Sequence, residues 1–283
     1  MALVLRSLYQ LYNSLFHDFK GDPRNDEHGF IGLGSPFPVL AIIACYVYFV
    51  KVLGPKMMEN RKPYDLTTVI YIYNIFQIFF NLYIGSVAIY NSYWNGKISL
   101  TCQPIDYTNK TPQMNRLIFA TYLYYFSKYL DLLDTIFFVL RKKFNQITFL
   151  HVYHHGGMIF AVYIFCKFLA GSHGTLLGIL NSFVHVVMYG YYFLTSFKPE
   201  LKDSLWWKKH ITQIQLMQFA ILVVHFINPI FFYECGHPKF VAAVGVTQNF
   251  FMFLLFSDFY YKAYVKKRLT FLFNNKFLDH QHL

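Results

Sequence analysis

Charged side chains are scarce in this sequence. Only 14% of the 283 residues are charged, whereas 55% are hydrophobic and 21% are aromatic. Soluble domains carry about 25% charged residues, so a chain of this length could not cover a soluble surface with the charge it has. We therefore expect lipid, and not water, to surround much of the protein.

Cysteine is also scarce, and its spacing excludes two kinds of site. The four cysteines, Cys45, Cys102, Cys166 and Cys235, form no CxxC pair, which argues against a zinc or redox motif. Cys45 and Cys166 fall within apolar runs and are expected to be inert thiols. Cys102 and Cys235 fall in short polar loops, and we predict a disulfide bond between them because both loops are placed on the same, non-cytosolic side.

Seven apolar segments are each long enough to cross a bilayer or nearly so. Because backbone groups in hydrocarbon need internal partners, each segment is predicted to be helical. We expect a single integral membrane domain over 1–283, with an N-terminal arm at 1–34 and a C-terminal tail at 265–283. The predicted helices lie near 36–53, 66–90, 116–140, 146–169, 174–196, 206–233 and 239–264.

Lysine and arginine alternate between the ends of these segments. More than half of the 25 basic residues follow segments one, three, five and seven, and basic residues mark the cytosolic side. The N-terminus is therefore predicted to be lumenal or exterior and the C-terminus cytosolic. The net charge of +11 is explained by these loops, and the sequence has no nucleic-acid motif. On the non-cytosolic side, Asn109-Lys110-Thr111 is a glycosylation sequon, followed directly by Pro112.

Ionisable residues inside the predicted helices indicate function, because they are costly in lipid. His151, His154 and His155 recur at spacings of three and four, which places them on one side of a helix. A neutral imidazole can act as nucleophile, general base or metal ligand. Packing histidines remain the structural alternative. A metal centre is disfavoured because the glutamate of HExxH and any second histidine box are absent.

Three further segments carry polar groups at a similar depth. Lys128 and Asp131 share a helix face, and they are as well explained by a buried ion pair that locks helix packing as by a functional site. At a rise of about 1.5 Å per residue, all these groups lie between the cytosolic ends and the middle of the helices. The pattern predicts a polar chamber open to the cytosol that continues into an apolar cavity. The other polar residues considered for this chamber are Asp134, Thr135, Asn181, His185, Met188, Tyr189, Tyr192 and Gln215.

Four motifs together resemble one family. The box HVYHH at 151–155, KYLDLLDT at 128–135, NSFVHVVMYGYY at 181–192 and TQIQLMQF at 212–219 are similar to motifs of the very-long-chain fatty acid elongases, the condensing enzymes called 3-ketoacyl-CoA synthases. Asp131 stands where that family usually has glutamate. The resemblance implies a seven-helix fold, with six helices around an acyl-chain tunnel, in the endoplasmic reticulum membrane.

The resemblance also implies the reaction and its partners. Malonyl-CoA would condense with a long-chain acyl-CoA to give a 3-ketoacyl-CoA, CO2 and CoA, without a metal or redox cofactor. A separate reductase, dehydratase and enoyl reductase would act on the product, and a second copy of the chain as a partner is left open. The candidates for holding the CoA phosphates are the basic residues on the cytosolic side, although each also fits a pure topology signal: Lys142, Lys143, Lys208, Lys209, Lys266 and Arg268.

These residues suggest a two-step mechanism. His154 attacks the acyl thioester to give an acyl-imidazole, and the enolate from malonyl-CoA then attacks the acyl group. His185 or His151 stabilises the enolate oxygen or moves a proton, while His155, Asp131 and Asn181 orient the rings. The alternatives are direct condensation with a histidine base, a metal-dependent lipid desaturase or hydroxylase, and a seven-helix receptor or transporter.

Overall fold

The computed structural model describes residues 4–7, 9–10, 21–27, 29, 32–202, 204–232, 234 and 236–266. Throughout that part of the chain the regular structure is helical, and no strand occurs in it. The expected all-α class is therefore confirmed. Cys235 and Arg268, and most of the predicted arm and tail, lie outside the described residues.

The described chain forms two compact units. Unit 1 combines the described residues of Met1–Leu66 with Tyr83–Ile179, and unit 2 combines Thr67–Leu82 with the described residues of Leu180–Leu283. Two helices pass from one unit to the other, α5 after Leu82 and α9 after Ile179.

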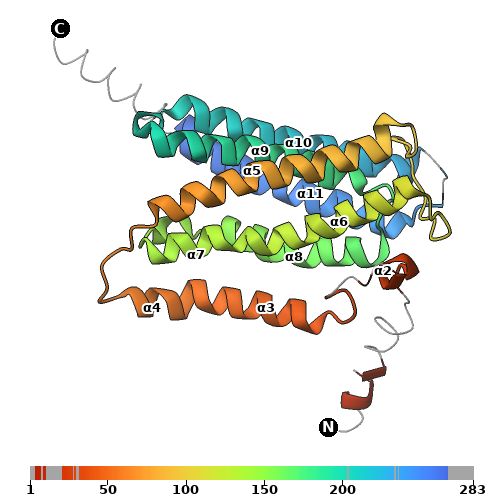
Figure 1. Ribbon diagram of the computed structural model, residues 1–283, viewed down its shortest axis with the longest axis horizontal. Coiled ribbons are helices and arrows are strands. Elements are labelled where there is room, and N and C mark those ends of the chain that lie inside the picture. Colours follow the sequence, from red (N-terminus) through yellow and green to blue (C-terminus); the bar gives the residue numbers. More distant parts are fainter. Residues whose placement is uncertain are drawn as a thin grey trace. The chain divides into compact units, whose positions relative to one another are not determined.

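Unit 1 contains the two short helices α2 and α4 and the longer helices α3, α6, α7 and α8, which lie along one another (Figure 1). Both α3 and α6 pack against α8, and α4 packs against α7. Their bounds are α2 Pro23–Glu27, α3 Phe37–Tyr48, α4 Gly54–Met58, α6 Pro112–Leu130, α7 Leu132–Leu140 and α8 Phe149–Phe168.

Unit 2 contains most of α9, part of α5, and the pair α10 and α11. The last two helices pack closely side by side (Figure 1). The bounds of these helices are α5 Thr67–Ile89, α9 Thr175–Phe197, α10 Leu205–Phe231 and α11 Lys239–Tyr260. In addition, π-helical turns at Phe49–Leu53, Tyr90–Trp94 and Tyr261–Lys266 extend α3, α5 and α11.

Six helical segments of the described chain are long and apolar enough to cross a membrane: Phe37–Met58, Thr67–Trp94, Phe149–Phe168, Thr175–Phe197, Trp206–Phe231 and Lys239–Lys266. The segment predicted near 116–140 is not among them. It consists of two helices, α6 and α7, that meet at Asp131, and its charged residues Arg116, Lys128, Asp131 and Asp134 lower its apolar character. The Asp131 backbone N–H still donates to Ser127 O at 2.9 Å, so helical hydrogen bonding continues across the junction.

A glycine allows α4 to approach α7 closely. A Cβ atom on Gly54 would lie 2.6 Å from Val139 Cγ1 and 2.9 Å from the Phe49 carbonyl oxygen, and both distances are shorter than a van der Waals contact. The loop after α4 is tied to the same end of α7, because Tyr64 N donates to Leu140 O at 3.1 Å.

The N-terminal arm caps the C-terminal end of α8. The last carbonyls of a helix lack intrahelical donors, and here residues distant in sequence supply them. Asn25 Nδ2 donates to Cys166 O at 3.0 Å, Asp22 N donates to Lys167 O at 2.8 Å, and Tyr107 Oη donates to Phe168 O at 2.8 Å. Burial and the Asp22 carboxylate raise the pKa of Tyr107, so its hydroxyl stays protonated.

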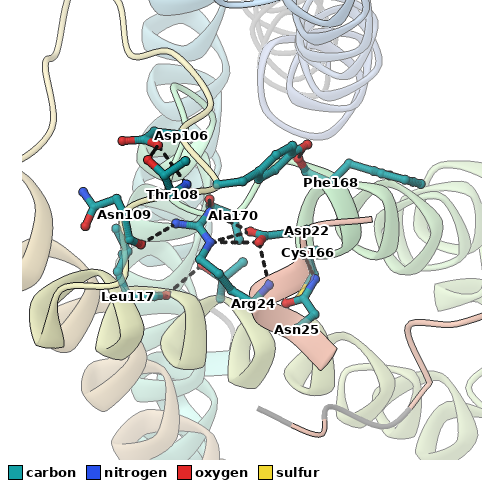
Figure 2. A network of polar contacts seen from close by, with 12 residues as sticks. Asp22, Arg24, Asn25, Asp106, Thr108, Asn109, Leu117, Cys166, Phe168 and Ala170 are labelled. Atoms are coloured by element: carbon teal, nitrogen blue, oxygen red, sulfur yellow. Dashed lines mark hydrogen bonds and ion pairs between the residues drawn. The ribbon is translucent and has the colours of Figure 1, made fainter. Parts of the chain in front are cut away.

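A buried ion pair holds this cap in place (Figure 2). The Arg24 guanidinium donates to both carboxylate oxygens of Asp22, with Nε–Oδ1 at 2.8 Å and Nη2–Oδ2 at 2.6 Å. It also donates to Asn109 O at 3.0 Å and to Ala170 O at 3.2 Å. The exposed fractions are only 1% for the Arg24 side chain and 0% for that of Asp22, so this pair fixes the arm, the 106–109 loop and the end of α8 together.

The thiols differ in state. Cys45 and Cys166 are free, and Cys102 is disulfide-bonded. Because Cys235 lies outside the described residues, its pairing with Cys102 stays a prediction.

We predict that Arg24→Gln destabilises the protein. The variant leaves the buried Asp22 carboxylate without its counter-charge, a change that costs about 3–5 kcal/mol in comparable pairs. The thermal midpoint of the purified protein should fall accordingly. Lys262→Met is the control, because its pair with Asp258 is 67% and 58% exposed and such pairs contribute about 1 kcal/mol or less. An Arg24→Gln midpoint equal to that of wild type would contradict this account of the cap.

Candidate functional site

The histidine box occupies the first turns of α8. Thr148 is the N-cap of this helix, and its hydroxyl accepts a hydrogen bond from His151 N at 3.3 Å. An N-cap of this type satisfies one of the donors that a helix start leaves open. His151, His154 and His155 are half-buried, and they lie at the positive end of the α8 dipole, which favours anionic groups.

A chain of hydroxyl groups orients the first imidazole. Thr135 Oγ1, on α7, lies 2.8 Å from His151 Nε2 and 2.8 Å from Tyr46 Oη on α3. Thr135 is fully buried, so these two hydrogen bonds are its means of avoiding an unsatisfied hydroxyl. Tyr46, Thr135 and His151 therefore connect three helices of unit 1 and fix the plane of the His151 ring.

The other two imidazoles, of His154 and His155, lie close to this hydrogen-bonded ring. The centroids of the His151 and His155 rings are 4.3 Å apart, and those of His154 and His155 are 5.7 Å apart in an edge-on arrangement. Phe138 of α7 also contacts His151, with ring centroids 5.4 Å apart. The structure thus brings the three predicted histidines together into one aromatic cluster.

Lys128 and Asp131 form the predicted ion pair. Lys128 Nζ lies 2.8 Å from Asp131 Oδ2, and each residue is 3% exposed. The ammonium group also lies 4.5 Å from the centroid of the Tyr124 ring, a cation–π distance. The pair sits at the α6–α7 junction, one helical turn before Thr135, and so holds the segment that presents Thr135 to His151.

The basic candidates differ in what they contact. Lys142 Nζ donates to Glu59 O at 3.1 Å and to Arg61 O at 3.0 Å, so it already ties α7 to the 59–64 loop. Lys143 is exposed. Four further basic residues follow the first predicted helix; the sequence analysis used them only as a topology signal and not as candidates for binding CoA: Lys51, Lys56, Arg61 and Lys62.

In unit 2 the candidates on α9 differ in burial. Asn181, His185 and Tyr189 are buried, Met188 is half-buried, and Tyr192 is 39% exposed. The His185 and Tyr189 rings contact each other edge-on at 5.7 Å. His185 and Tyr189 are therefore one connected pair on the buried side of α9.

The remaining unit 2 candidates lie on α10 and at the end of the π-helical turn after α11. Gln215, Lys208 and Lys209 are half-buried, whereas Lys266 is exposed. Gln213 donates to Tyr260 Oη of α11 at 3.1 Å, an interhelical hydrogen bond of the kind that joins helices in membranes.

The sequence interpretation missed a polar face on α5. Tyr73, Asn74, Gln77 and Asn81 of unit 2 are all buried, although they lie within an apolar segment. The spacing of Asn74, Gln77 and Asn81 by three and four residues was the available signal, because it places three amides on one helix face.

Within the described residues, no group of three or more His, Cys, Asp or Glu side chains is arranged to hold a metal ion. His151 engages a hydroxyl through Nε2. The arrangement offers imidazoles oriented by hydrogen bonds, which suits nucleophilic or acid–base chemistry.

We predict that Asp131→Asn destabilises unit 1 more than Asp131→Glu, because only the amide leaves the buried Lys128 ammonium without this carboxylate. The expected loss is about 3–5 kcal/mol for Asp131→Asn, measured as a lowered thermal midpoint. Asp258→Asn, in an exposed pair, is the control and should change little. Equal midpoints for Asp131→Asn and wild type would count against a stabilising pair.

Comparison with known proteins extends over nearly the whole chain. Residues 32–270 match the family model described as ELO: GNS1/SUR4 family. The chain is 44% identical over 248 residues to very long chain fatty acid elongase 7 of Rattus norvegicus, covering 87% of this chain and 86% of the relative. It is 41% identical over 272 residues to very long chain fatty acid elongase AAEL008004 of Aedes aegypti, covering 95% and 74%. It is 39% identical over 251 residues to very long chain fatty acid elongase 1 of Homo sapiens, covering 88% of each.

Proposed function

The chain belongs to the GNS1/SUR4 family, and the relatives described above are named very long chain fatty acid elongases. We propose that it catalyses the condensing step of fatty acid elongation. The reaction joins malonyl-CoA to a long-chain acyl-CoA and gives a 3-ketoacyl-CoA, CO2 and CoA. This makes the chain a very-long-chain 3-oxoacyl-CoA synthase. The desaturase or hydroxylase interpretation and the receptor or transporter interpretation are not favoured by these relatives.

One observation carries the proposal: Thr135 holds His151 by a hydrogen bond, and the His151 ring lies against that of His155, which meets His154 edge-on. An oriented imidazole cluster at the start of a helix can supply a nucleophile and a proton carrier side by side. The positive end of α8 favours the negative charge that develops when a thioester carbonyl is attacked.

The first step forms an acyl-enzyme. A His154 ring nitrogen attacks the thioester carbonyl carbon, a C–N bond forms, and the C–S bond breaks. The CoA thiolate leaves and takes up the proton that the imidazole loses. His155 and His151 are the neighbouring groups that can carry this proton.

The second step makes the carbon–carbon bond. Malonyl-CoA loses CO2, and the electron pair of the broken C–C bond becomes the enolate. The enolate carbon attacks the acyl carbonyl, the C–N bond breaks, and the departing His154 imidazolate takes up one proton from water, carried by His155 or His151, which regenerates the neutral ring. The electrons for the new bond come from decarboxylation, so the reaction needs no metal or redox cofactor. His185 is the proposed donor to the enolate oxygen, and direct condensation with a histidine base is the alternative route.

The other residues fit substrate binding. Exposed basic groups such as Lys143 and Lys266 suit the CoA phosphates, together with Lys208, Lys209 and Arg268, whereas Lys142 is partly engaged by backbone carbonyls. The residues proposed to line the path of the acyl thioester are Lys128, Asp134, Thr135, Asn181, Met188, Tyr189, Tyr192 and Gln215.

The proposal includes a membrane topology. We place α6 and α7 as a seventh crossing, because Lys128 and Asp131 neutralise each other inside the protein, with six helices around an acyl-chain tunnel. The positive loops put the N-terminus in the lumen of the endoplasmic reticulum and the C-terminus in the cytosol. The reductase, dehydratase and enoyl reductase of the elongation cycle are the proposed consumers of the product.

We predict that His154→Ala abolishes condensation while the protein remains folded. Malonyl-CoA-dependent chain growth should fall to background, and the thermal midpoint should stay near that of wild type. Incubation of wild type with acyl-CoA alone should give an acylated His154 peptide by mass spectrometry. Full turnover without any acylated peptide would favour direct condensation, and appreciable product from His154→Ala would exclude His154 as the nucleophile.

We also predict that Thr135→Val lowers kcat by about tenfold, because His151 loses the hydrogen bond that orients it, worth about 1–1.5 kcal/mol. Thr121→Val is the matched control, since Thr121 is a buried threonine of α6 whose hydroxyl donates only to Leu117 O, at 2.9 Å. The ratio of kcat values between the two variants checks the assignment. Equal kcat values would show that the Thr135 hydroxyl does not act through His151.

A further inference from the structure

The missed face of α5 contains three buried amides. Asn74 is 2% exposed, and Gln77 and Asn81 are 0% exposed. A buried amide without a partner costs roughly 1–3 kcal/mol in proteins, and polar side chains inside a membrane helix are functional candidates by default. The question for each amide is therefore what satisfies it.

Two of the three amides are connected to protein groups. Asn81 Nδ2 donates to Gln77 Oε1 at 3.1 Å, and Gln77 Nε2 donates to Tyr73 Oη at 2.8 Å. Tyr73 Oη lies in turn 3.1 Å from Tyr189 Oη of α9. This network is an interhelical hydrogen-bond chain within unit 2, and it accounts for the conformations of Gln77 and Asn81.

Among the N–H groups of the three amides, Asn74 Nδ2 is the exception, whereas in Asn81 it is the acceptor Oδ1 that has no partner among the described residues. The Asn74 Nδ2 atom is buried and has no hydrogen-bond acceptor among the residues that the structure describes. Native proteins satisfy the great majority of buried polar groups, and a helix in a membrane has no bulk water nearby to compensate. An unsatisfied donor at this position is best explained as one whose acceptor arrives with a ligand.

Contacts between α5 and α9 give the depth of Asn74. The Tyr71 ring lies 5.0 Å from the rings of Phe193 and Phe197, whereas Tyr73 contacts Tyr189. Moving forward along α5 thus means moving backward along α9, so the two helices are antiparallel. Asn74 directly follows Tyr73 and therefore lies close to the level of Tyr189, which is about one helical turn from His185 along α9.

The Asn74 amide is a hydrogen-bond donor, and this determines which chemical group of a ligand it can bind. A side-chain amide N–H needs an oxygen acceptor, and the acyl-CoA substrate has one such oxygen next to its apolar tail, the thioester carbonyl. We propose that Asn74 is a substrate-binding residue whose amide donates a hydrogen bond to this carbonyl oxygen. The inference rests on the proposed function, because it takes its ligand from that reaction.

A binding comparison tests Asn74 separately from catalysis. The probes are a saturated long-chain acyl-CoA and the corresponding alkyl-CoA thioether, in which CH2 replaces the carbonyl group. Wild type should bind the thioester about tenfold more tightly than the thioether, because a tenfold change in Kd corresponds to the free energy of about one hydrogen bond to a buried donor. Asn74→Leu, of similar volume, should lose this preference and bind the two probes alike.

The matched control is Asn249→Leu. Asn249 is also a buried asparagine of unit 2, 5% exposed, but its Nδ2 donates to Gly245 O at 2.8 Å within α11. This variant should keep the preference of wild type. The thermal midpoint of substrate-free Asn74→Leu should equal or exceed that of wild type, because the substitution removes an unsatisfied buried donor. If the leucine variant does not accumulate in cells, Asn74→Met is used for the same binding comparison.

The outcomes separate the two proposals. An unchanged preference for the thioester in Asn74→Leu would overturn the role of Asn74 while leaving the condensing function in place. Equal loss of preference in Asn74→Leu and Asn249→Leu would show a general disturbance of unit 2 and would also overturn it. If Asn74→Leu alone loses the preference, and wild type does not extend the acyl chain that it binds, the results would support the Asn74 binding site and refute the condensing reaction.

Discussion

Hydrocarbon cannot form hydrogen bonds, and the rest of the structure depends on this constraint. Every amide, hydroxyl and charge placed in the apolar helices must find a partner within the protein. The backbone meets this requirement by forming helices, which explains why aromatic and β-branched segments that favour strands in water are helical here. Polar side chains meet this requirement by forming hydrogen bonds and ion pairs with one another.

The helix α8 shows how both of its ends are satisfied. Thr148 caps the end that carries the histidines, and groups from the N-terminal arm and the 106–109 loop donate to the carbonyls at the other end. The buried Asp22–Arg24 pair holds these donors together. Both ends of the helix that carries the histidine cluster are therefore held by hydrogen bonds to other parts of unit 1.

Polar groups inside the helices divide into those that build the scaffold and those that present a reactive atom. Gln77 and Tyr73 are joined by a hydrogen bond and belong to the scaffold, and Lys128 and Asp131 neutralise each other at the α6–α7 junction. Thr135 belongs to both groups, since its hydroxyl forms one hydrogen bond with Tyr46 and another with His151. Asn74 Nδ2 has neither kind of contact among the described residues. A protein that leaves such a donor unsatisfied gives up stability at that position, which is the usual cost of a binding site.

Several features could be predicted from sequence because they depend on local spacing. The long apolar runs determined the helical class and the approximate helix limits, for example 146–169 against the observed Phe149–Phe168. The spacing of His151, His154 and His155 determined that they share one side of a helix, and the spacing of Lys128 and Asp131 determined their ion pair. These are contacts within one helix or its neighbouring turn, where 3.6 residues per turn decide which side chains meet.

Only the tertiary structure decided which distant residues complete these local patterns. Nothing in the spacing of Tyr46 relates it to Thr135, 89 positions later, and nothing in Asn25 relates it to the carbonyl of Cys166. The role of Lys142 as a donor to the 59–61 backbone, and not a free cation, likewise depends on how α7 meets the loop after α4. Such contacts are set by helix packing, and helix packing depends on the shapes of many side chains at once, which no short motif encodes.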